Sequence, residues 1–313
     1  MELIIIGGVI LTTAVLIGII LNYFPVVRHY TIETNKITEP FTAAHISDLH
    51  ECRFGKGQRR ILSLTEAISP DVIFITGDTV EDGKPFYHKE RLLPTDNPAR
   101  ELFAGLSDIA PCYAVFGNHE SNIPHIERLA EDIRSLGINL FYRDRGYGDD
   151  KASVMSLGGR SVLIFGADDP FFDRESHEIT KRKNIVRRII EDKGIDGSGK
   201  KKWRDRLREE YAGISSREQL TILLSHRPEE HELYRELGFD AAFSGHAHGG
   251  QWRLPPFNNG VFAPDQGLFP DYAGGIYRYD GFVHVVSRGL SVKRMVRIFN
   301  RPEICAVTFV PLP

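Results

Sequence analysis

This sequence has few cysteines, a small net charge and no internal repeat, and each of these features excludes a class of protein. Three cysteines, an odd number without paired spacing, do not predict a disulfide framework, and Cys52 is expected to be a buried packing residue. The formal net charge of -3 predicts neither nucleic-acid binding nor acidic-ligand binding. No internal repeat is visible, which excludes a repeat architecture. The composition, 42% hydrophobic and 26% charged, is that of a globular protein with one or two domains.

Basic residues are also missing from the N-terminus. No charged residue lies between Glu2 and Arg28, and a helix over Leu3–Phe24 would measure about 33 Å, enough to cross a hydrocarbon core of about 30 Å. A cleavable signal peptide has a basic start and a small-residue cleavage site, and neither is present. We therefore expect residues 1–25 to be an uncleaved, single-pass transmembrane anchor. Because Arg28 and Lys36 follow it, the positive-inside rule predicts a cytoplasmic catalytic domain.

Short apolar runs alternate with helical patterns along most of the chain. After a polar connector at 26–40, which begins with a short strand, helical spacing is found over 57–67 and 125–136. Runs too short for helices predict buried strands at 41–46, 71–76, 112–116, 161–165, 220–224 and 239–243. This alternation indicates a layered α/β fold with central sheets. Antiparallel strands are expected near the end of the chain, at 274–279, 282–287 and 303–310, with a turn at Asp280-Gly281.

A basic stretch at 174–208 interrupts this pattern, within an insertion of about 171–215. It contains thirteen Lys or Arg residues against six Asp or Glu residues. Two solvated helices would account for it, and so would a basic surface that contacts anionic lipid headgroups. Nucleic-acid binding is the third alternative, but the stretch has few aromatic residues for base stacking, with Trp203 the main one.

Five short segments, each at the end of an apolar run, carry side chains that bind metals or contact phosphate. They are Asp48-Leu49-His50, Gly77-Asp78, Gly117-Asn118-His119-Glu120, Ser225-His226 and Gly245-His246-Ala247-His248. Taken singly, most of these segments are ordinary turns. All five in order at strand ends would bring together the carboxylate, imidazole and amide groups of a two-metal hydrolytic centre. Asp78, whose carboxylate has two oxygens, is the natural bridge between two metals.

This series of motifs is similar to the calcineurin-like metallophosphoesterase superfamily over about residues 43–250. Later segments, from His248-Gly-Gly-Gln251 to Ser287-Arg-Gly-Leu290, resemble its membrane-associated branch of YaeI/YkuE-type phosphodiesterases and UDP-2,3-diacylglucosamine hydrolases. The resemblance implies a four-layer α/β/β/α sandwich over 41–313, with the metal site at the strand ends. The sequence departs from the branch at Gly289-Leu290-Ser291, where such chains often read Gly-Leu-Gly.

The resemblance also implies a role for each polar residue of the five segments. One metal would be held by Asp48, His50, Asp78 and His248, and the second by Asp78, Asn118, His226 and His246. His119 would be the catalytic residue that contacts the substrate phosphate and assists the leaving group. Glu120 would either orient His119 or lie in solvent as a turn residue. Two divalent ions are expected, manganese first, with iron, zinc or cobalt as alternatives.

These residues predict a hydrolase that uses a metal-activated hydroxide to attack phosphorus. The leading substrate is a phosphodiester or pyrophosphate on a lipid-linked or headgroup-bearing molecule, with UDP-2,3-diacylglucosamine as one example. The alternatives are a phosphomonoesterase, including a phosphoprotein phosphatase, and a non-catalytic membrane scaffold. The expected partners are the lipid bilayer and this substrate, and neither a specific nucleic acid nor a protein partner is predicted.

Overall fold

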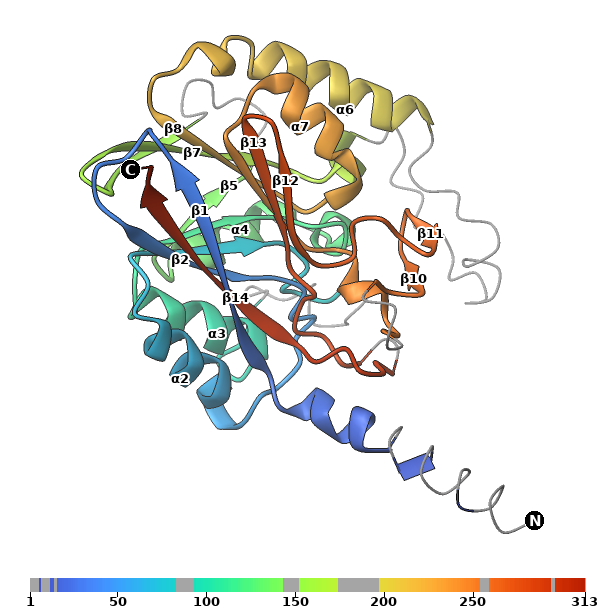
Figure 1. Ribbon diagram of the computed structural model, residues 1–313. Coiled ribbons are helices and arrows are strands. Elements are labelled where there is room, and N and C mark those ends of the chain that lie inside the picture. Colours follow the sequence, from blue (N-terminus) through green and yellow to red (C-terminus); the bar gives the residue numbers. More distant parts are fainter. Residues whose placement is uncertain are drawn as a thin grey trace.

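Two six-stranded sheets form the centre of the molecule, with helices on their outer sides (Figure 1). The computed structural model describes residues 6, 12–13, 16–82, 93–142, 152–173, 197–253, 259–293 and 296–312. The first sheet has the strand order β1 (Val26–Thr34), β14 (Glu303–Pro311), β2 (Phe41–Ile46), β3 (Val72–Thr76), β4 (Cys112–Val115) and β5 (Ile138–Phe141). The second has the order β12 (Gly275–Tyr279), β13 (Phe282–Val286), β9 (Ala241–Ser244), β8 (Leu220–Ser225), β7 (Arg160–Ala167) and β6 (Ala152–Leu157).

The main helices divide into two groups, one for each sheet. The first group is α2 (Arg59–Ile68), α3 (Pro98–Ser107) and α4 (Ile126–Arg134), and the second is α6 (Gly197–Glu210) and α7 (His231–Leu237). A two-stranded sheet of β10 (Phe262–Ala263) and β11 (Gly267–Leu268) lies apart from both large sheets. Short 3-10 helices complete the described elements: η1 (Leu21–Tyr23), η2 (Lys56–Gln58), η4 (Glu120–Asn122), η5 (Pro170–Asp173), η6 (Ile214–Ser216), η7 (Pro228–Glu230) and η8 (His248–Gly250).

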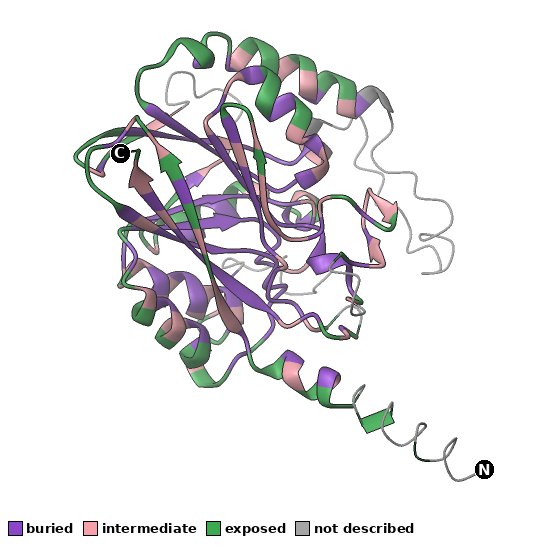
Figure 2. Ribbon diagram, viewed as in Figure 1, coloured by how far each residue is buried: buried purple, intermediate pink, exposed green. Residues whose placement is uncertain are grey.

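Three hydrophobic cores separate four layers. The first core joins α2, α3 and α4 to one face of the first sheet. The second core lies between the two sheets, where Phe74, Phe243 and Phe309 are buried. The third joins the outer face of the second sheet to α6 and α7 through Trp203 and Tyr234. The buried residues therefore lie along the strands in the middle of the molecule and on one side of each outer helix (Figure 2). The central strands are continuously apolar because both of their faces are covered.

The strands at the end of the chain pair differently from the expectation. β12 and β13 form the predicted antiparallel hairpin at the Asp280-Gly281 turn, and β13 then runs parallel to β9. β14 instead crosses to the first sheet, where it is antiparallel to β2 and parallel to β1. The short strand expected at the start of 26–40 is nine residues long and forms the edge of that sheet. Its polar sequence fits an edge position, where only Ile32 is buried.

The described part of the basic stretch packs against the body of the protein. In α6, Trp203 and Leu207 are fully buried, and Trp203 Nε1 donates a hydrogen bond to the Asp168 carbonyl at 2.8 Å. This face of α6 belongs to the third core, whereas Lys201, Lys202 and Arg208 are exposed on its other side, so the solvated-helix interpretation holds for the charged face alone. Its arginines also pair with carboxylates of the body, in the pairs Arg204–Glu230, Arg206–Asp168 and Arg208–Glu236. Residues 174–196 lie outside the described residues, and their lipid-contacting role stays a prediction.

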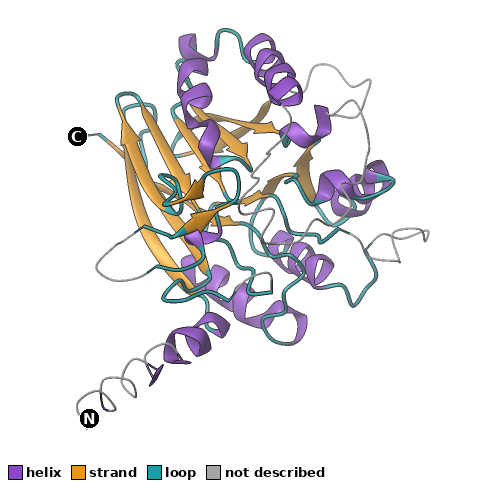
Figure 3. Ribbon diagram, turned by 90° about the vertical axis from the view of Figure 1, so that its right-hand side faces the viewer, coloured by secondary structure: helices purple, strands orange, loops and turns teal. Residues whose placement is uncertain are grey.

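The described end of the N-terminal segment projects away from the two sheets (Figure 3). Residues 16–20 are helical and lead into η1, and the side chains of Leu16, Ile17 and Ile20 are more than half exposed. Among the described residues, no helix combines the length and apolar character needed to cross a membrane. Most of the predicted span 3–24 lies outside those residues, so the anchor stays a prediction.

Candidate metal centre

The five sequence segments meet where the two sheets present the ends of parallel strands. β2, β3 and β4 run parallel in the first sheet, and β8 and β9 run parallel in the second. Asp48, Asp78 and Asn118 follow the first three strands, and His226 and His246 follow the other two. Because the carboxyl ends of parallel strands lie at one edge of a sheet, two packed sheets can bring all these residues together.

The backbone at this edge is held in an uncommon conformation. Asp48, His50, Asp78, His246 and His248 all have positive φ, between 46° and 65°. Residues with side chains seldom adopt this region, and such strain persists only where the surroundings enforce it. All five are buried, and all five are predicted ligands. The fold therefore holds the side chains of these residues at fixed positions in the site.

Asp48, His50 and His248 form the first cluster, in which one ligand atom from each residue lies within 4.8 Å of the others. Asp48 Oδ1 is 4.0 Å from His50 Nε2 and 3.7 Å from His248 Nε2. Burial lowers the pKa of His50 and holds that of His248 well below its usual range. Two neutral imidazoles beside a carboxylate are suitable ligands for a divalent transition-metal ion.

Asp78, His226 and His246 form the second cluster by the same distance criterion. His226 Nε2 lies 3.2 Å from both Asp78 Oδ2 and His246 Nδ1. The same Asp78 oxygen is 3.5 Å from His50 Nε2 in the first cluster. Asp78 thus lies between the clusters, which is the position expected for a ligand shared by two ions.

Two predicted ligand atoms lack the partners that buried polar atoms normally have. His50 Nε2 and Asn118 Oδ1 are buried and accept or donate no hydrogen bond within the described part of the chain. Buried polar groups are almost always hydrogen-bonded, so these two atoms point to a missing partner. A set of imidazole nitrogens, carboxylate oxygens and an amide oxygen suits manganese, iron, zinc or cobalt. The residues therefore fit a pair of divalent ions.

The far nitrogens of three imidazoles are held by oxygen atoms outside the clusters. His226 Nδ1 lies 2.6 Å from the Thr76 carbonyl, and His50 Nδ1 lies 2.9 Å from Glu81 Oε2. His246 Nε2 lies 2.8 Å from Asp265 Oδ2. An N–H donated to such an oxygen leaves the opposite nitrogen with a free lone pair for a metal. In each case that opposite nitrogen is the one that faces the cluster.

The Arg227 guanidinium contacts Asp265, and this role of Arg227 was not predicted from the sequence. Its side chain is buried, and its Nε lies 2.5 Å from Asp169 Oδ2. Its Nη1 contacts Asp265 Oδ2 and lies 2.9 Å from His246 Nε2. The side chain therefore joins two carboxylates to the second cluster. Its position immediately after His226 is the one sequence signal that could have suggested a role.

His119 lies beside the first cluster rather than within it. Its backbone N–H donates to Asp78 Oδ1 at 2.8 Å, and its Nε2 is 3.9 Å from Asp78 Oδ2. The opposite nitrogen, Nδ1, is 3.0 Å from Asp82 Oδ1 and 3.5 Å from Glu81 Oε1. Neither carboxylate was predicted as a site residue from the sequence, although both follow Asp78 within four residues. They hold the His119 ring by one nitrogen and leave the other nitrogen on the side of Asp78.

Glu120 has neither of the two roles considered for it. It is buried, and its carboxylate accepts hydrogen bonds from the backbone N–H groups of Asp78, Thr79, Val80 and Gly117 at 2.7–3.0 Å. The side chain therefore ties the loop after β3 to the loop after β4. These loops also touch at two glycines, because a Cβ on Gly77 would lie only 2.6 Å from the Gly117 nitrogen. Glu120 is a structural clamp beneath the site.

The geometry agrees with what comparison with known proteins shows. The profile of the family described as calcineurin-like phosphoesterase matches residues 41–250. Phosphodiesterase YaeI of Escherichia coli (strain K12) is 22% identical over 298 residues, which cover 92% of this chain and 89% of that protein. The UDP-2,3-diacylglucosamine pyrophosphatase LpxG of Chlamydia trachomatis is 35% identical over 290 residues, which cover 83% of this chain and 80% of that protein.

Among solved structures, the NAD nucleotidase (NadN) of Haemophilus influenzae has a TM-score of 0.45 and 16% identity, over 80% of this chain and 45% of that chain. The family profile covers more than half of the sequence, and the resemblance seen in the five segments is confirmed. The chain therefore belongs to the calcineurin-like phosphoesterase family, whose members are hydrolytic metallophosphoesterases.

Proposed function

We propose that the protein is a membrane-attached phosphodiesterase or pyrophosphatase with two divalent ions in its active site. Asp48, His50, Asp78 and His248 would hold one ion, and Asp78, Asn118, His226 and His246 the other. The observation that carries the proposal is the position of Asp78 Oδ2, 3.5 Å from His50 Nε2 and 3.2 Å from His226 Nε2. A single carboxylate between two imidazole clusters is suited to bridge two cations. Manganese is the first candidate for both.

When bound, such ions supply a nucleophilic hydroxide near neutral pH and positive charge for phosphoryl oxygens. His119 is the residue outside the ligand sets that can act on the leaving group. Its Nδ1 is held by Asp82 and Glu81, and its Nε2 lies on the side of the metal clusters, 3.9 Å from Asp78 Oδ2, where it would donate a hydrogen bond or a proton to a departing oxygen. The half-buried carboxylates of Glu81 and Asp82 behind the ring hold it in this orientation.

The substrate class proposed is a phosphodiester or pyrophosphate carried by a lipid-linked molecule. The names of two relatives support it, because one is a phosphodiesterase and another is a UDP-2,3-diacylglucosamine pyrophosphatase. The apolar run 3–24 supports attachment to a membrane, and Arg28 and Lys36 after it support a cytoplasmic active site. Resistance of the full chain to alkaline extraction from membranes tests the attachment.

Hydrolysis of bis-p-nitrophenyl phosphate by the purified full chain tests the reaction. Mn²⁺ should stimulate it, and Asp78→Ala should lower the rate by at least about a hundredfold, since even residues behind metal ligands contribute 10–100-fold. Asp108→Ala is the matched control, because Asp108 is exposed and distant in sequence from every segment of the site. Full activity of Asp78→Ala would refute the two-metal site.

Two further measurements separate the alternative functions. A faster reaction with p-nitrophenyl phosphate than with the diester would indicate a phosphomonoesterase. No hydrolysis of either compound by protein that retains its fold would indicate a non-catalytic scaffold. Incubation with a total membrane lipid extract and with UDP-2,3-diacylglucosamine, followed by mass analysis of the products, would then identify the substrate.

A further inference from the structure

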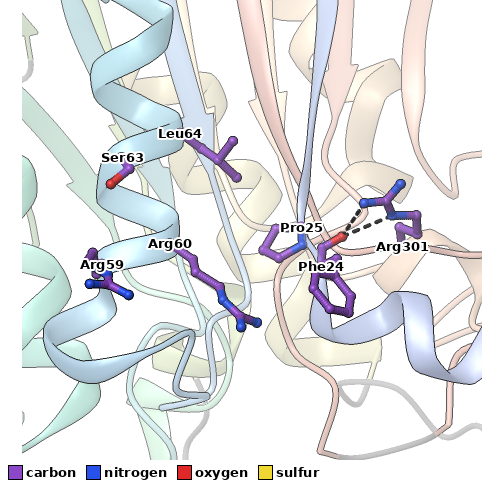
Figure 4. Close-up of a pocket in the computed structure, with 7 residues that line it drawn as sticks. All are labelled: Phe24, Pro25, Arg59, Arg60, Ser63, Leu64 and Arg301. Atoms are coloured by element: carbon purple, nitrogen blue, oxygen red, sulfur yellow. Dashed lines mark hydrogen bonds between the residues drawn. The ribbon is translucent and has the colours of Figure 1, made fainter.

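A pocket of about 400 Å³ lies where the N-terminal segment enters the first sheet (Figure 4). Three parts of the chain line it, and none belongs to the metal centre. Phe24 and Pro25 come from the end of the N-terminal segment, and Arg301 comes from the loop before β14. The remaining wall is one side of α2, formed by Arg59, Arg60, Ser63 and Leu64.

Three arginines give this pocket a positive charge that no carboxylate neutralises within the described part of the chain. Arg301 donates from Nε and Nη2 to the Phe24 carbonyl, at 3.0 and 2.7 Å (Figure 4). Arg60 donates from Nη1 to the Tyr23 carbonyl at 3.0 Å, and its guanidinium carbon lies 5.2 Å from the centre of the Phe24 ring. These oxygens are neutral, so both charges persist. The exposed Arg59 has no ion pair or side-chain hydrogen bond in that part of the chain.

The rest of the pocket wall is apolar, and it lies at the end of the longest apolar run in the sequence. Phe24 is the last residue of that run, and it is 47% exposed beside Leu64 and the buried Pro25. The same part of the molecule carries another exposed aromatic residue, Phe299, which lies against Gly18. Aromatic and basic side chains at the end of an apolar segment are typical of the level at which a membrane protein meets lipid headgroups.

We propose that this pocket binds the phosphate group of an anionic phospholipid. Guanidinium groups bind phosphate through paired N–H donors, and the Ser63 hydroxyl adds a neutral donor. Phe24, Pro25 and Leu64 would contact the apolar part of the same lipid. A free phosphate ion shares the charge but lacks that part, and a zwitterionic lipid adds a cation that the arginines repel. The inference rests on the proposed membrane attachment and is independent of the reaction.

Bound at this pocket, the lipid would fix the angle between the N-terminal segment and the first sheet. Arg60 and Arg301 already hold the last carbonyls of that segment, so a phosphate beside them would join the segment to α2 and to the start of β14. The active site would then be held in one orientation relative to the bilayer.

Thermal unfolding of the full chain in micelles of a neutral detergent tests the proposal. Dioleoylphosphatidylglycerol should raise the unfolding temperature saturably, whereas dioleoylphosphatidylcholine and inorganic phosphate should not. Arg59→Gln should weaken the apparent affinity for the anionic lipid about fivefold, the effect expected of one basic residue near an anionic surface. Ser63→Glu should abolish the response, because it adds a negative charge to the pocket and leaves the three arginines in place.

Arg128→Gln on α4 is the control, because it removes an equal charge from an exposed site on another helix. It should respond to the anionic lipid like the wild type. An unchanged response of Ser63→Glu would overturn the proposal, as would an equal response to phosphatidylcholine or to phosphate alone. Hydrolysis of bis-p-nitrophenyl phosphate should be the same in all these variants, so a failure of the lipid site is distinct from a failure of the proposed reaction.

Discussion

Asp265 controls the orientation of His246 in the second cluster, although it touches no other predicted ligand of that cluster. Its Oδ2 lies 2.8 Å from His246 Nε2 and contacts the buried guanidinium of Arg227. Asp265→Asn keeps the shape of the side chain but removes its charge. We expect Mn²⁺ affinity to fall about 10–100-fold, the usual effect of removing a carboxylate behind a ligating imidazole.

Isothermal titration of the metal-free protein with Mn²⁺ measures this change, and the Mn²⁺ dependence of hydrolysis should shift by the same factor. Asp271→Asn, an exposed substitution in the same region of the chain, is the control. Rates at saturating Mn²⁺ should recover, since no ligand has been removed. Unaltered Mn²⁺ affinity in Asp265→Asn would mean that the carboxylate only packs against Arg227.

His119 is expected to act on the leaving group and not on metal binding. Its Nε2 lies 3.9 Å from Asp78 Oδ2, outside both clusters, and its other nitrogen is held by Asp82. His119→Gln should lower kcat by about 10²–10⁴-fold with unchanged Mn²⁺ content, as expected for loss of a general acid. The loss should shrink as the leaving group becomes more acidic, which a series of substituted phenyl esters would measure. An equal loss for every leaving group, or loss of bound Mn²⁺, would contradict the role.

At the scale of the elements, the loops that carry the ligands depend on one buried side chain. Glu120 accepts four backbone N–H groups from the loops after β3 and β4. Glu120→Gln would turn an amide N–H₂ group toward these donors and leave some of them unsatisfied. We expect the free energy of unfolding to fall by about 1–3 kcal/mol. Denaturant titration measures it, with the exposed Glu127→Gln on α4 as control. Equal stability of the two variants would show that the clamp contributes nothing.

The elements that lead into the site were predictable because each carries a local signal. Runs such as 71–76 and 220–224 are mostly apolar and too short for helices, and β3 and β8 lie there with five and six buried residues. The pairing of β14 with β1 and β2 carried no such signal, because pairing between distant segments depends on the whole sheet. α3 was missed for another reason. Its apolar residues follow a sequence rich in polar residues and proline, and the Asn97 side chain caps it by accepting hydrogen bonds from the backbone N–H groups of Ala99 and Arg100.

The predicted site residues likewise carry a local sequence signal, and the unpredicted ones do not. Asp48, Asp78 and His226 stand at the ends of recognisable strands, so their meeting follows from the sheet order. Asp265 lies in the turn between the two-residue strands β10 and β11, where no periodic pattern precedes it. Its contact with His246 arises only when that turn packs against the second cluster. A residue that orients a metal ligand from a distant part of the chain has no characteristic sequence spacing from that ligand, so no motif predicts it.

At the scale of the whole molecule, the site exists only while the two sheets are packed together. The first sheet supplies Asp48, His50, Asp78 and Asn118, and the second supplies His226, His246 and His248. The core between the sheets is therefore also the support of the metal centre. Two buried histidines link the stability of the sheets to pH: His45 faces this core, and His284 lies on the opposite face of the second sheet, against Tyr234.

His45 and His284 are buried in β2 and β13. Each shares one side-chain hydrogen bond within the described residues, His45 Nε2 with Thr76 Oγ1 at 2.7 Å and His284 Nε2 with Ser244 Oγ at 2.9 Å. Burial lowers the pKa of each to about 3. Since the unfolded pKa is about 6.5, the unfolded chain binds protons below that pH while the folded chain does not. The stabilisation that each neutral imidazole provides is complete above pH 6.5 and is lost as the pH falls toward 3.

We therefore expect each of these histidines to lower the free energy of unfolding by about 1.4 kcal/mol between pH 7.5 and pH 5.5. His284→Gln should lose that share of the pH dependence, because a glutamine takes up no proton in either state. Urea titrations of metal-free protein at the two pH values measure the difference, and protons bound by the ligand histidines cancel in the comparison with wild type. His125→Gln, at an exposed histidine, should keep the full pH dependence. If His284→Gln kept it as well, His284 would have to be protonated in the folded protein, and the packing of the second sheet against α7 would be more open to water than its burial indicates.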